Sequence, residues 1–260
     1  MKNRPLPFIM FFVSIKREGK YMLELKNISY DVEDNKEILK DINLKIDGGF
    51  VAITGPNGGG KSTLAKVIAG IIKPTSGQII LDGEDITGLS ITERAKKGIS
   101  YAFQTPVKFK GLTVKDLLKL SMGKNASFNE ECNILSSVGL CARDYINREV
   151  NASLSGGELK RIEIAMILAR GTKLSLFDEP EAGIDLWSFN SLIKVFEHMR
   201  ETVKGTIVII SHQERILNTA DRIIVLKEGR LIKEGTKDEV YGDLLDGVDS
   251  GVCDRLEENI

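Results

Sequence analysis

The segment GPNGGGKST at residues 55–63 contains the residue types that bind phosphate groups. It fits the spacing G-x-x-x-x-G-K-[ST], in which glycines leave main-chain N–H groups open to phosphate oxygens and permit positive φ angles. In this pattern Lys61 bridges the β- and γ-phosphates, Ser62 ligates Mg²⁺ and Thr63 contacts the α-phosphate. The segment therefore predicts a nucleotide site formed by Gly55, Pro56, Asn57, Gly58, Gly59, Gly60, Lys61, Ser62 and Thr63.

The neighbouring residues favour this interpretation over a chance glycine-rich turn. FVAIT at residues 50–54 is a continuous apolar run, which is typical of a strand buried on both faces. LAKVIAGI, which begins at residue 64, has helical spacing. A strand, a glycine loop and a helix in this order place the positive end of the helix dipole beside the bound phosphates.

A second segment, KLSLFDEP at residues 173–180, is an apolar strand pattern that ends in two carboxylates. An aspartate delivered beside a phosphate loop by a buried strand supports Mg²⁺, so we assign that role to Asp178. Glu179, one residue further on, can orient an attacking water as its general base. Two solvated acids at a strand end are the alternative, and this segment alone favours that alternative.

A third segment, LSGGELKRIEIAMILAR at residues 154–170, opens a predicted helix with Ser155, Gly156 and Gly157. Such a helix start offers free N–H groups to an anion. A single γ-phosphate can use this helix start and the phosphate loop together if they come from different subunits. The chain is therefore expected to form a homodimer when ATP is bound, whereas a serine N-cap on a core helix is the alternative when the stretch stands alone.

The pattern of elements predicts an α/β fold with a P-loop NTPase core. Apolar alternation at residues 23–28 and 42–46 indicates an antiparallel β subdomain near the N-terminus, and helical patterns between Phe103 and Lys173 indicate an inserted α-helical subdomain at about 105–170. Further strands are expected at residues 78–83, 99–103, 173–178, 206–211, 222–229 and 230–235.

The composition of the chain limits which binding partners and which cellular compartment we expect. The chain has 260 residues with 36 basic and 37 acidic side chains, so no overall charge favours nucleic acid. Its three cysteines are an odd number without metal-ligand spacing, which predicts a reducing, cytoplasmic location. Residues 1–21 hold an apolar run too short to span a bilayer. We expect them to be a flexible extension, or else a weak interfacial or partner-binding segment, ahead of a single domain at 22–260.

Taken in order, these segments resemble the nucleotide-binding subunit of the ATP-binding cassette (ABC) family from about residue 22 to 240. GPNGGGKST resembles its phosphate loop, YAFQTP its Q-loop, LSGGE its signature, LSLFDEP its Walker B strand, EAGID its D-loop and IISHQ its switch segment. The fold and the ATPase activity of that family, with ATP and Mg²⁺, are what the resemblance implies.

The resemblance also implies roles for residues that the local patterns leave open. Tyr30 would stack on adenine, Gln104 would contact Mg²⁺ and the attacking water, His212 would contact the γ-phosphate and Asp185 would communicate across the dimer. The structural alternatives are an edge-strand tyrosine, a surface amide, a histidine at a strand end and a helix N-cap.

Within the family, ELKRIEIA with Lys160, Arg161 and Glu163, and FQTPVKFKGLTV at residues 103–114, resemble the SUF-type (SufC-like) ATPase of iron–sulfur cluster assembly. That branch implies a SUF B/D-like scaffold bound through the Q-loop surface at residues 105–112. The DEP ending of Walker B instead has the common transporter form. The alternative is therefore the ATP-binding subunit of a membrane transporter, with a permease on the same surface. A non-enzymatic ATP-gated clamp lacks support, because the chain has no second cassette, coiled-coil insert or basic bias.

Overall fold

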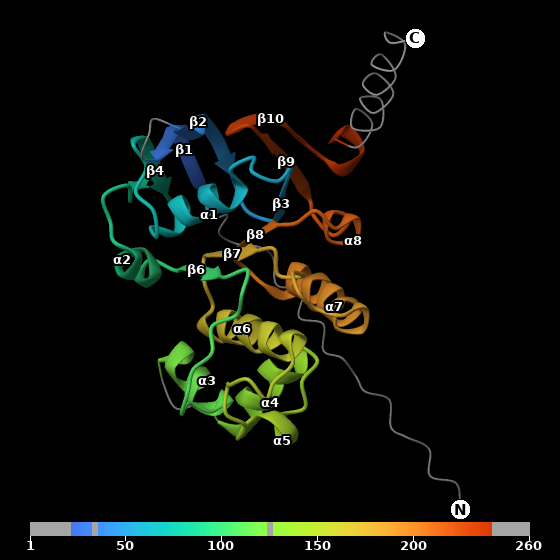
Figure 1. The fold of residues 1–260 in the computed structure, drawn as a ribbon. Coiled ribbons are helices and arrows are strands. Elements are labelled where there is room, and N and C mark those ends of the chain that lie inside the picture. The colour runs from blue at the N-terminus through green and yellow to red at the C-terminus, as the bar shows by residue number, and fades with distance from the viewer. Residues whose placement is uncertain (1–21, 33–35, 124–126, 241–260) are drawn as a thin grey trace, which may run out of the picture.

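The computed structural model describes residues 22–32, 36–123 and 127–240, which form two β-sheets and a set of helices (Figure 1). The strands are β1 (Leu23–Val32), β2 (Lys36–Ile46), β3 (Phe50–Thr54), β4 (Ser76–Leu81), β5 (Glu84–Asp85), β6 (Ile99–Ala102), β7 (Leu174–Asp178), β8 (Thr206–Ile210), β9 (Arg222–Lys227) and β10 (Arg230–Gly235). The helices are α1 (Lys61–Ala69), α2 (Ile91–Lys96), α3 (Val114–Met122), α4 (Phe128–Ser137), α5 (Ala142–Tyr145), α6 (Gly156–Arg170), α7 (Leu186–Thr202) and α8 (Glu214–Leu217).

The predicted strands and the longer predicted helices are confirmed. The expected extension at residues 1–21 lies outside the described residues, so the division into an extension and one domain stays a prediction.

The larger sheet has six strands in the order β10-β9-β3-β8-β7-β6. The strands from β9 to β6 are parallel neighbours, and β10 joins the edge in the antiparallel direction. Because the carboxyl ends of parallel strands meet at one edge of a sheet, the segments that follow β3, β8, β7 and β6 lie side by side. This topology brings together four sequence motifs that are far apart along the chain.

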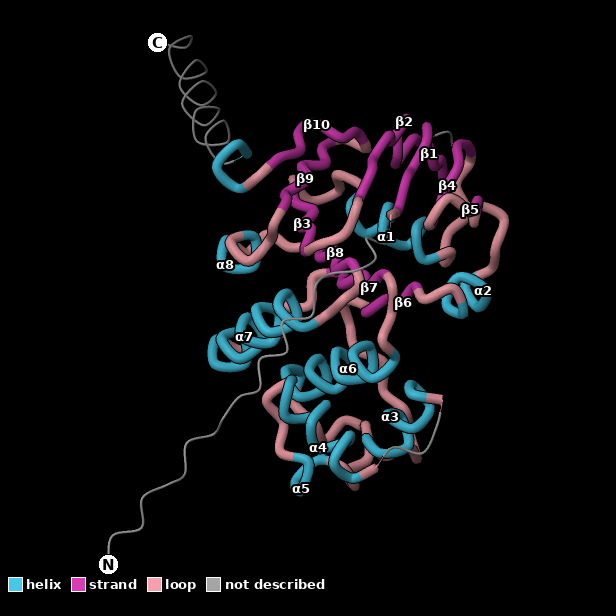
Figure 2. The backbone as a smooth tube through the Cα atoms, turned by 180° about the vertical axis from the view of Figure 1, so that it is seen from behind, coloured by secondary structure: helices cyan, strands magenta, loops and turns pink. Residues whose placement is uncertain are grey.

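The smaller sheet has the order β2-β1-β4-β5 and is antiparallel throughout. Figures 1 and 2 place it at one end of the molecule and helices α3, α4 and α5 at the other, with strands β6, β7 and β8 of the larger sheet between them. Ile28, Leu39 and Ile42 are buried where this sheet packs against α1 and the larger sheet. The predicted antiparallel subdomain is thus confirmed.

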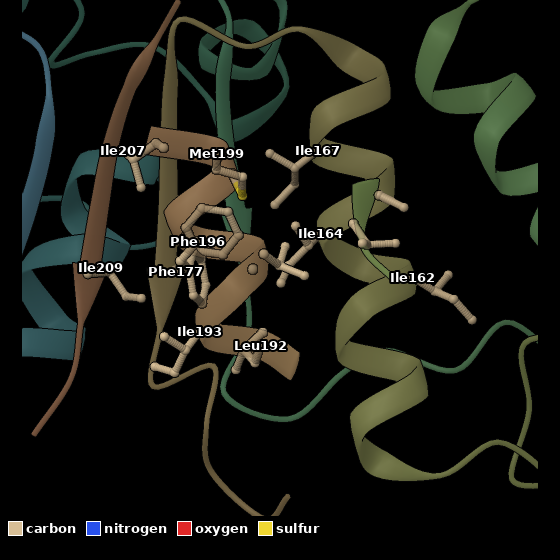
Figure 3. Close-up of a cluster of buried hydrophobic side chains, with 14 of the residues drawn as sticks. Ile162, Ile164, Ile167, Phe177, Leu192, Ile193, Phe196, Met199, Ile207 and Ile209 are labelled. Carbon is tan, nitrogen blue, oxygen red and sulfur yellow. The ribbon is translucent and has the colours of Figure 1, made fainter. Parts of the chain in front are cut away.

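The larger sheet is buried on both faces, and its alternating side chains enter two different cores. In β8, Ile207 and Ile209 belong to the core that contains α6 and α7, whereas Val208 and Ile210 belong to the core that contains α1. On the α7 side, the ring of Phe196 packs edge-on against Phe177 with 5.2 Å between centroids (Figure 3). These contacts fix the strand ends relative to the helices.

Helix α6 has apolar side chains on two sides. Ile164 and Ile167 point toward α7, whereas Ile162 projects from the other side of the helix (Figure 3). All three side chains are buried in one core that also includes residues of α3 and α4. Helix α6 therefore connects the inserted helices to the sheet that carries the functional segments.

Helix α2, which the sequence patterns did not predict, supports the C-terminal end of α1. Its Arg94 is 1% exposed and donates hydrogen bonds to the carbonyl oxygens of Val67 (2.7 Å) and Ile68 (2.9 Å) in α1. It also donates to the carbonyls of Thr87 and Leu89. A cation at this position satisfies helix-terminal carbonyls and complements the negative end of the helix dipole.

Candidate active site

The phosphate loop has the backbone conformation that its glycines predicted. Gly55, Gly58 and Gly60 have φ angles of 129°, 76° and 96°, all in the region that side chains rarely adopt. A Cβ atom on Gly55 would lie 1.9 Å from the carbonyl oxygen of Leu226, whereas one on Gly58 would meet no atom of the described residues within 4 Å. Close packing against β9 therefore explains Gly55, whereas the φ angle alone explains Gly58.

Helix α1 begins directly after this loop, at Lys61, with Gly60 as its N-cap. Within the part of the chain that the structure describes, no side chain caps the helix, and its first turn holds no acidic residue. Its first N–H groups and the positive end of its dipole therefore suit an anion such as a phosphate.

The Lys61 ammonium is held against the loop itself. Its Nζ donates to the carbonyl oxygens of Gly55 (2.8 Å) and Pro56 (2.9 Å), and the residue is 5% exposed. Burial lowers the pKa of Lys61, although the nearby carboxylates of Glu179 and Asp178 raise it. Glu179 and Asp178 therefore lie at the same edge of the sheet as the phosphate loop.

Asp178, at the end of β7, is 3% exposed and accepts two hydrogen bonds. Its Oδ1 accepts from the Ser62 hydroxyl (2.7 Å) and its Oδ2 accepts from the Tyr101 hydroxyl (2.6 Å). A hydroxyl and a carboxylate are the oxygen ligands that Mg²⁺ prefers, so Ser62 and Asp178 fit this metal directly or through its waters. The structure thus joins two of the three residues predicted for the metal, Ser62 and Asp178. The side chain of the third, Gln104, donates a hydrogen bond to Glu179, so its contact with Mg²⁺ stays a prediction.

Glu179 lies where three predicted segments meet. Its Oε2 accepts a hydrogen bond from Gln104 Nε2 (2.6 Å), and its Oε1 is 3.7 Å from His212 Nε2. Its φ of 44° is unusual for a residue with a side chain and is a form of backbone strain often found at functional sites. Burial and the Lys61 charge lower the pKa of His212, which favours the neutral imidazole at pH 7. Glu179 is therefore positioned by side chains from two neighbouring strand ends.

The signature residues lie against a different part of the chain. Ser155 caps α6 by accepting from Glu158 N–H (3.2 Å), and the Glu158 carboxylate accepts from Ser155 N–H (2.7 Å). A Cβ atom on Gly156 would lie 3.3 Å from the carbonyl oxygen of Gly183, and one on Gly157 would lie 2.5 Å from the Ser188 side chain. Ser155 and Gly156 are exposed and can meet another molecule.

The positions of Asp185 and Tyr30 fit their predicted roles, but they fit equally well the structural alternatives, a helix N-cap and a structural tyrosine in a strand. Asp185 is exposed and caps α7, with its Oδ1 accepting from the N–H groups of Trp187 (2.9 Å) and Ser188 (3.0 Å). Tyr30 is half-buried, packs against the core and pairs with Leu39 across β1 and β2. The roles of both residues toward a nucleotide stay predictions, as does the contact of Thr63 with the α-phosphate.

Several residues at the site were missed by the sequence patterns. Tyr101 lies in the run ISYAF at residues 99–103, which predicts a strand and does not indicate a contact with Asp178. Glu181 is partly buried, accepts a hydrogen bond from the Ser211 hydroxyl beside His212, and has its pKa raised by burial. Lys160 and Glu163 contact the Phe103 backbone. The sequence names Lys160 and Glu163 for the resemblance to the SUF-type ATPase but does not predict this contact, and charged residues inside an apolar helix are the signal that could have indicated it.

A groove of about 280 Å³ lies beside Gln104, between α2, β6, α3 and α6. Its lining includes the large apolar side chains Ile91, Phe103 and Val107, which are 47%, 39% and 46% exposed. Exposed apolar groups gathered in this way mark a surface that can bind another protein.

Comparison with known proteins assigns the family. The sequence pattern of the family described as ABC transporter matches residues 39–182, more than half of the chain. An uncharacterized ABC transporter ATP-binding protein of Methanocaldococcus jannaschii is 42% identical over 216 residues, which cover 79% of this chain and 86% of the relative. The chain belongs to the ABC transporter ATP-binding family. As an ABC ATPase, it hydrolyses ATP with Mg²⁺.

Solved structures agree with the ABC ATPase fold. A dimeric ATP-binding cassette in a post-hydrolysis state with ADP and phosphate has a TM-score of 0.72 and 27% identity, covering 82% of this chain and 98% of that one. The cbiO1 cassette of Clostridium perfringens, part of the ABC transporter complex cbiONQ, has a TM-score of 0.74 and 29% identity, covering 90% of this chain and 96% of that one. In the part of this ABC ATPase that the structure describes, no helix has the length and apolarity to span a membrane.

Proposed function

We propose that this ABC ATPase binds ATP between the phosphate loop of one subunit and residues 155–157 of a second copy. The supporting observation is the separation of the two segments within one chain. The phosphate loop packs against Leu226, whereas Gly156 packs against Gly183 in the D-loop segment EAGID. Ser155 and Gly156 remain exposed, so they can approach a nucleotide held by another subunit.

In this proposal the residues around Glu179 carry out hydrolysis. Lys61 neutralises charge on the β- and γ-phosphates, and Ser62 with Asp178 supports Mg²⁺, which supplies further charge neutralisation when bound. Glu179 orients the attacking water and accepts its proton, whereas Gln104 and His212 hold the Glu179 carboxylate. The hydrogen bond from Gln104 and the 3.7 Å approach of His212 to Glu179 support this division of roles.

The groove beside Gln104 is the proposed site for the partner that the ATPase moves. Gln104 contacts Glu179 and is followed by the surface at residues 105–112, so the partner surface and the hydrolysis site are connected through one side chain. Phe103 and Val107 give this surface exposed apolar area that a partner can cover.

A membrane permease is the partner that the comparisons support better. The M. jannaschii relative is named as an ABC transporter ATP-binding protein, and the C. perfringens cassette belongs to a transporter complex. On this proposal the chain is the ATP-binding subunit of an ABC transporter, and a permease segment docks in the groove.

A SUF B/D-like scaffold for iron–sulfur cluster assembly is the second candidate. It is favoured by the resemblance of the FQTPV and KRIEI segments to that branch, and these segments touch each other in the fold. Lys160 Nζ donates to the Phe103 carbonyl oxygen (2.6 Å), and Glu163 accepts from the Phe103 N–H (3.1 Å). The two segments that resemble this branch therefore form one contact next to the proposed partner surface.

Capture with a hydrolysis-deficient variant tests the proposed function. Glu179→Gln should bind ATP but not hydrolyse it, so affinity-tagged Glu179→Gln is expected to retain both a second copy and the partner in the presence of ATP and Mg²⁺. The capture is made from detergent-solubilised membranes and, separately, from the membrane-free fraction of the producing cells, and the partner is identified by mass spectrometry.

Two matched variants make the capture specific. Lys61→Ala should not bind ATP and should lose the second copy, and Val107→Asp in the Glu179→Gln background should keep the second copy but lose the partner. An integral membrane permease supports the transporter subunit, and a membrane-free complex that carries iron and sulfide supports the scaffold. A partner whose retention is the same with Val107→Asp contradicts the groove as the docking site.

A further inference from the structure

The backbone of Phe103 is held on both sides by two charged side chains of α6. Its N–H donates to Glu163 Oε1 (3.1 Å), and its carbonyl oxygen accepts from Lys160 Nζ (2.6 Å). Strand β6 is the edge strand of the sheet, so no strand on that side pairs with this peptide among the described residues. Side chains of α6 therefore replace the strand partner that the edge lacks.

This arrangement removes two charged side chains from water, which costs free energy. The Lys160 side chain is 2% exposed and the Glu163 side chain is 17% exposed, with 3.9 Å between Nζ and Oε2. The buried Oε2 atom of Glu163 has no hydrogen-bond partner among the described residues. A buried ion pair often contributes no net stability relative to apolar residues, so stability alone does not account for these two side chains.

The held peptide leads directly to the hydrolysis site. Gln104 follows Phe103, and Gln104 Nε2 donates to Glu179 Oε2 (2.6 Å). At the other end of the connection, Lys160 lies five residues after Ser155 on α6, which is about 7.5 Å along the helix axis. The Phe103 peptide thus joins α6 to the side chain that contacts Glu179.

We propose that Lys160 and Glu163 are positioning residues that set Gln104 against Glu179 and link the signature helix to the hydrolysis site of the same chain. This proposal rests on the roles proposed above for Gln104 and Glu179. In the dimer proposed above, residues 155–157 meet the nucleotide of the other subunit, so the link would give each hydrolysis site a response to the state of its neighbour. Coupling of this kind requires an element that both sites bias, and α6 is that element.

A double-mutant cycle on the full-length protein tests the link. Lys160→Met should lower kcat for ATP hydrolysis about tenfold while leaving the KM for ATP within about twofold, because Gln104 is displaced but the phosphate loop is unchanged. Glu163→Leu should do the same. In the Gln104→Ala background, Lys160→Met should have less than about a twofold further effect, because both changes act through one contact.

Conservative and distant variants separate positioning from folding. Lys160→Arg retains a donor and Glu163→Gln retains an acceptor for the Phe103 peptide, so both should keep most of the wild-type kcat. Lys119→Met, an exposed lysine change on α3, should leave kcat and KM unchanged. Thermal unfolding is followed for every variant, and kcat is measured below the temperature at which any of them begins to unfold.

Three results overturn the proposal. An unchanged kcat in Lys160→Met and Glu163→Leu removes the link. Equal losses from Lys160→Met in the wild-type and Gln104→Ala backgrounds show that α6 acts independently of Gln104, and leave the role of Gln104 intact. An unchanged kcat in Gln104→Ala removes both the link and the proposed role of Gln104.

Discussion

Asp178 shows how single contacts define this site. Its two carboxylate oxygens accept from different hydroxyl groups, Ser62 on one side and Tyr101 on the other. Burial and the hydrogen bond to Asp178 raise the pKa of Tyr101, so its hydroxyl stays protonated and remains a donor at all physiological pH values. Tyr101 therefore fixes the direction in which Asp178 faces the metal position.

We expect Tyr101→Phe to raise the Mg²⁺ concentration needed for half-maximal ATPase activity about tenfold, because groups that orient a metal ligand commonly affect affinity by this amount. The measurement is a Mg²⁺ titration of the rate at saturating ATP. Tyr145→Phe removes another hydroxyl that donates to a carboxylate, that of Glu158, and should leave the Mg²⁺ requirement unchanged. The same Mg²⁺ requirement in Tyr101→Phe and the wild type would show that Asp178 does not need this hydroxyl.

Among single residues, the sequence predicted those that belong to a local motif and missed those that act only through a contact distant in the chain. Ser62 and Asp178 could be assigned because the phosphate loop and a strand ending in acids are local patterns. Tyr101 acts through a contact with Asp178, 77 residues away along the chain. No local pattern records such a contact, because it depends on the neighbouring positions of β6 and β7 in the sheet.

At the scale of elements, α1 is supported at both ends by groups outside it. Its N-terminal end follows the phosphate loop, and its C-terminal carbonyls accept from the buried guanidinium of Arg94 in α2. Burial lowers the pKa of Arg94, but it remains a cation because arginine titrates so far above neutral pH. The position of the phosphate-binding helix thus depends on a residue outside the active site.

Replacement of Arg94 by Met should lower the free energy of unfolding by about 3 kcal/mol, because carbonyls of α1 and of the loop before α2 lose their donor. Chemical denaturation, checked for two-state behaviour, measures this change. Arg143→Met is a matched substitution at an exposed position and should change the free energy of unfolding by less than about 0.5 kcal/mol. Equal stability of the two variants would contradict the supporting role of Arg94.

The long elements could be predicted and the short ones could not. Continuous apolar runs such as FVAIT and the helical spacing of α6 are strong signals, because many side chains share one periodicity. Helix α2 has six residues, so its periodicity covers less than two turns. Its capping box, in which Ser90 and Glu93 bond each other's backbone N–H groups, is the signal that could have identified it.

At the scale of the whole molecule, strand order creates the site. The order β3-β8-β7-β6 places the phosphate loop, His212, Glu179 and Gln104 along one edge of the sheet, although they are up to 157 positions apart in the chain. The motifs predicted the members of this set through the resemblance to the ABC family. The contacts between them, and the link from Phe103 to α6, could not be predicted because they arise only from the packed arrangement.

The central proposal at this scale is that two chains complete each other's nucleotide sites. Within one chain the phosphate loop packs against β9, and the signature residues pack against the start of α7. In a symmetric dimer each subunit would present its signature to the phosphate loop of the other, which gives two equivalent composite sites. Damage to the two segments on different subunits should therefore leave one composite site intact.

The most direct measurement is the ATPase rate of mixed subunits, one carrying Lys61→Ala and the other Gly156→Asp, which places a negative charge at the signature. Neither variant alone should hydrolyse ATP. An equimolar mixture should recover about a quarter of the wild-type rate, because random pairing makes half of the dimers mixed and each mixed dimer has one of its two sites intact. A mixture as inactive as its separate components, or full activity of either variant alone, would contradict the shared sites.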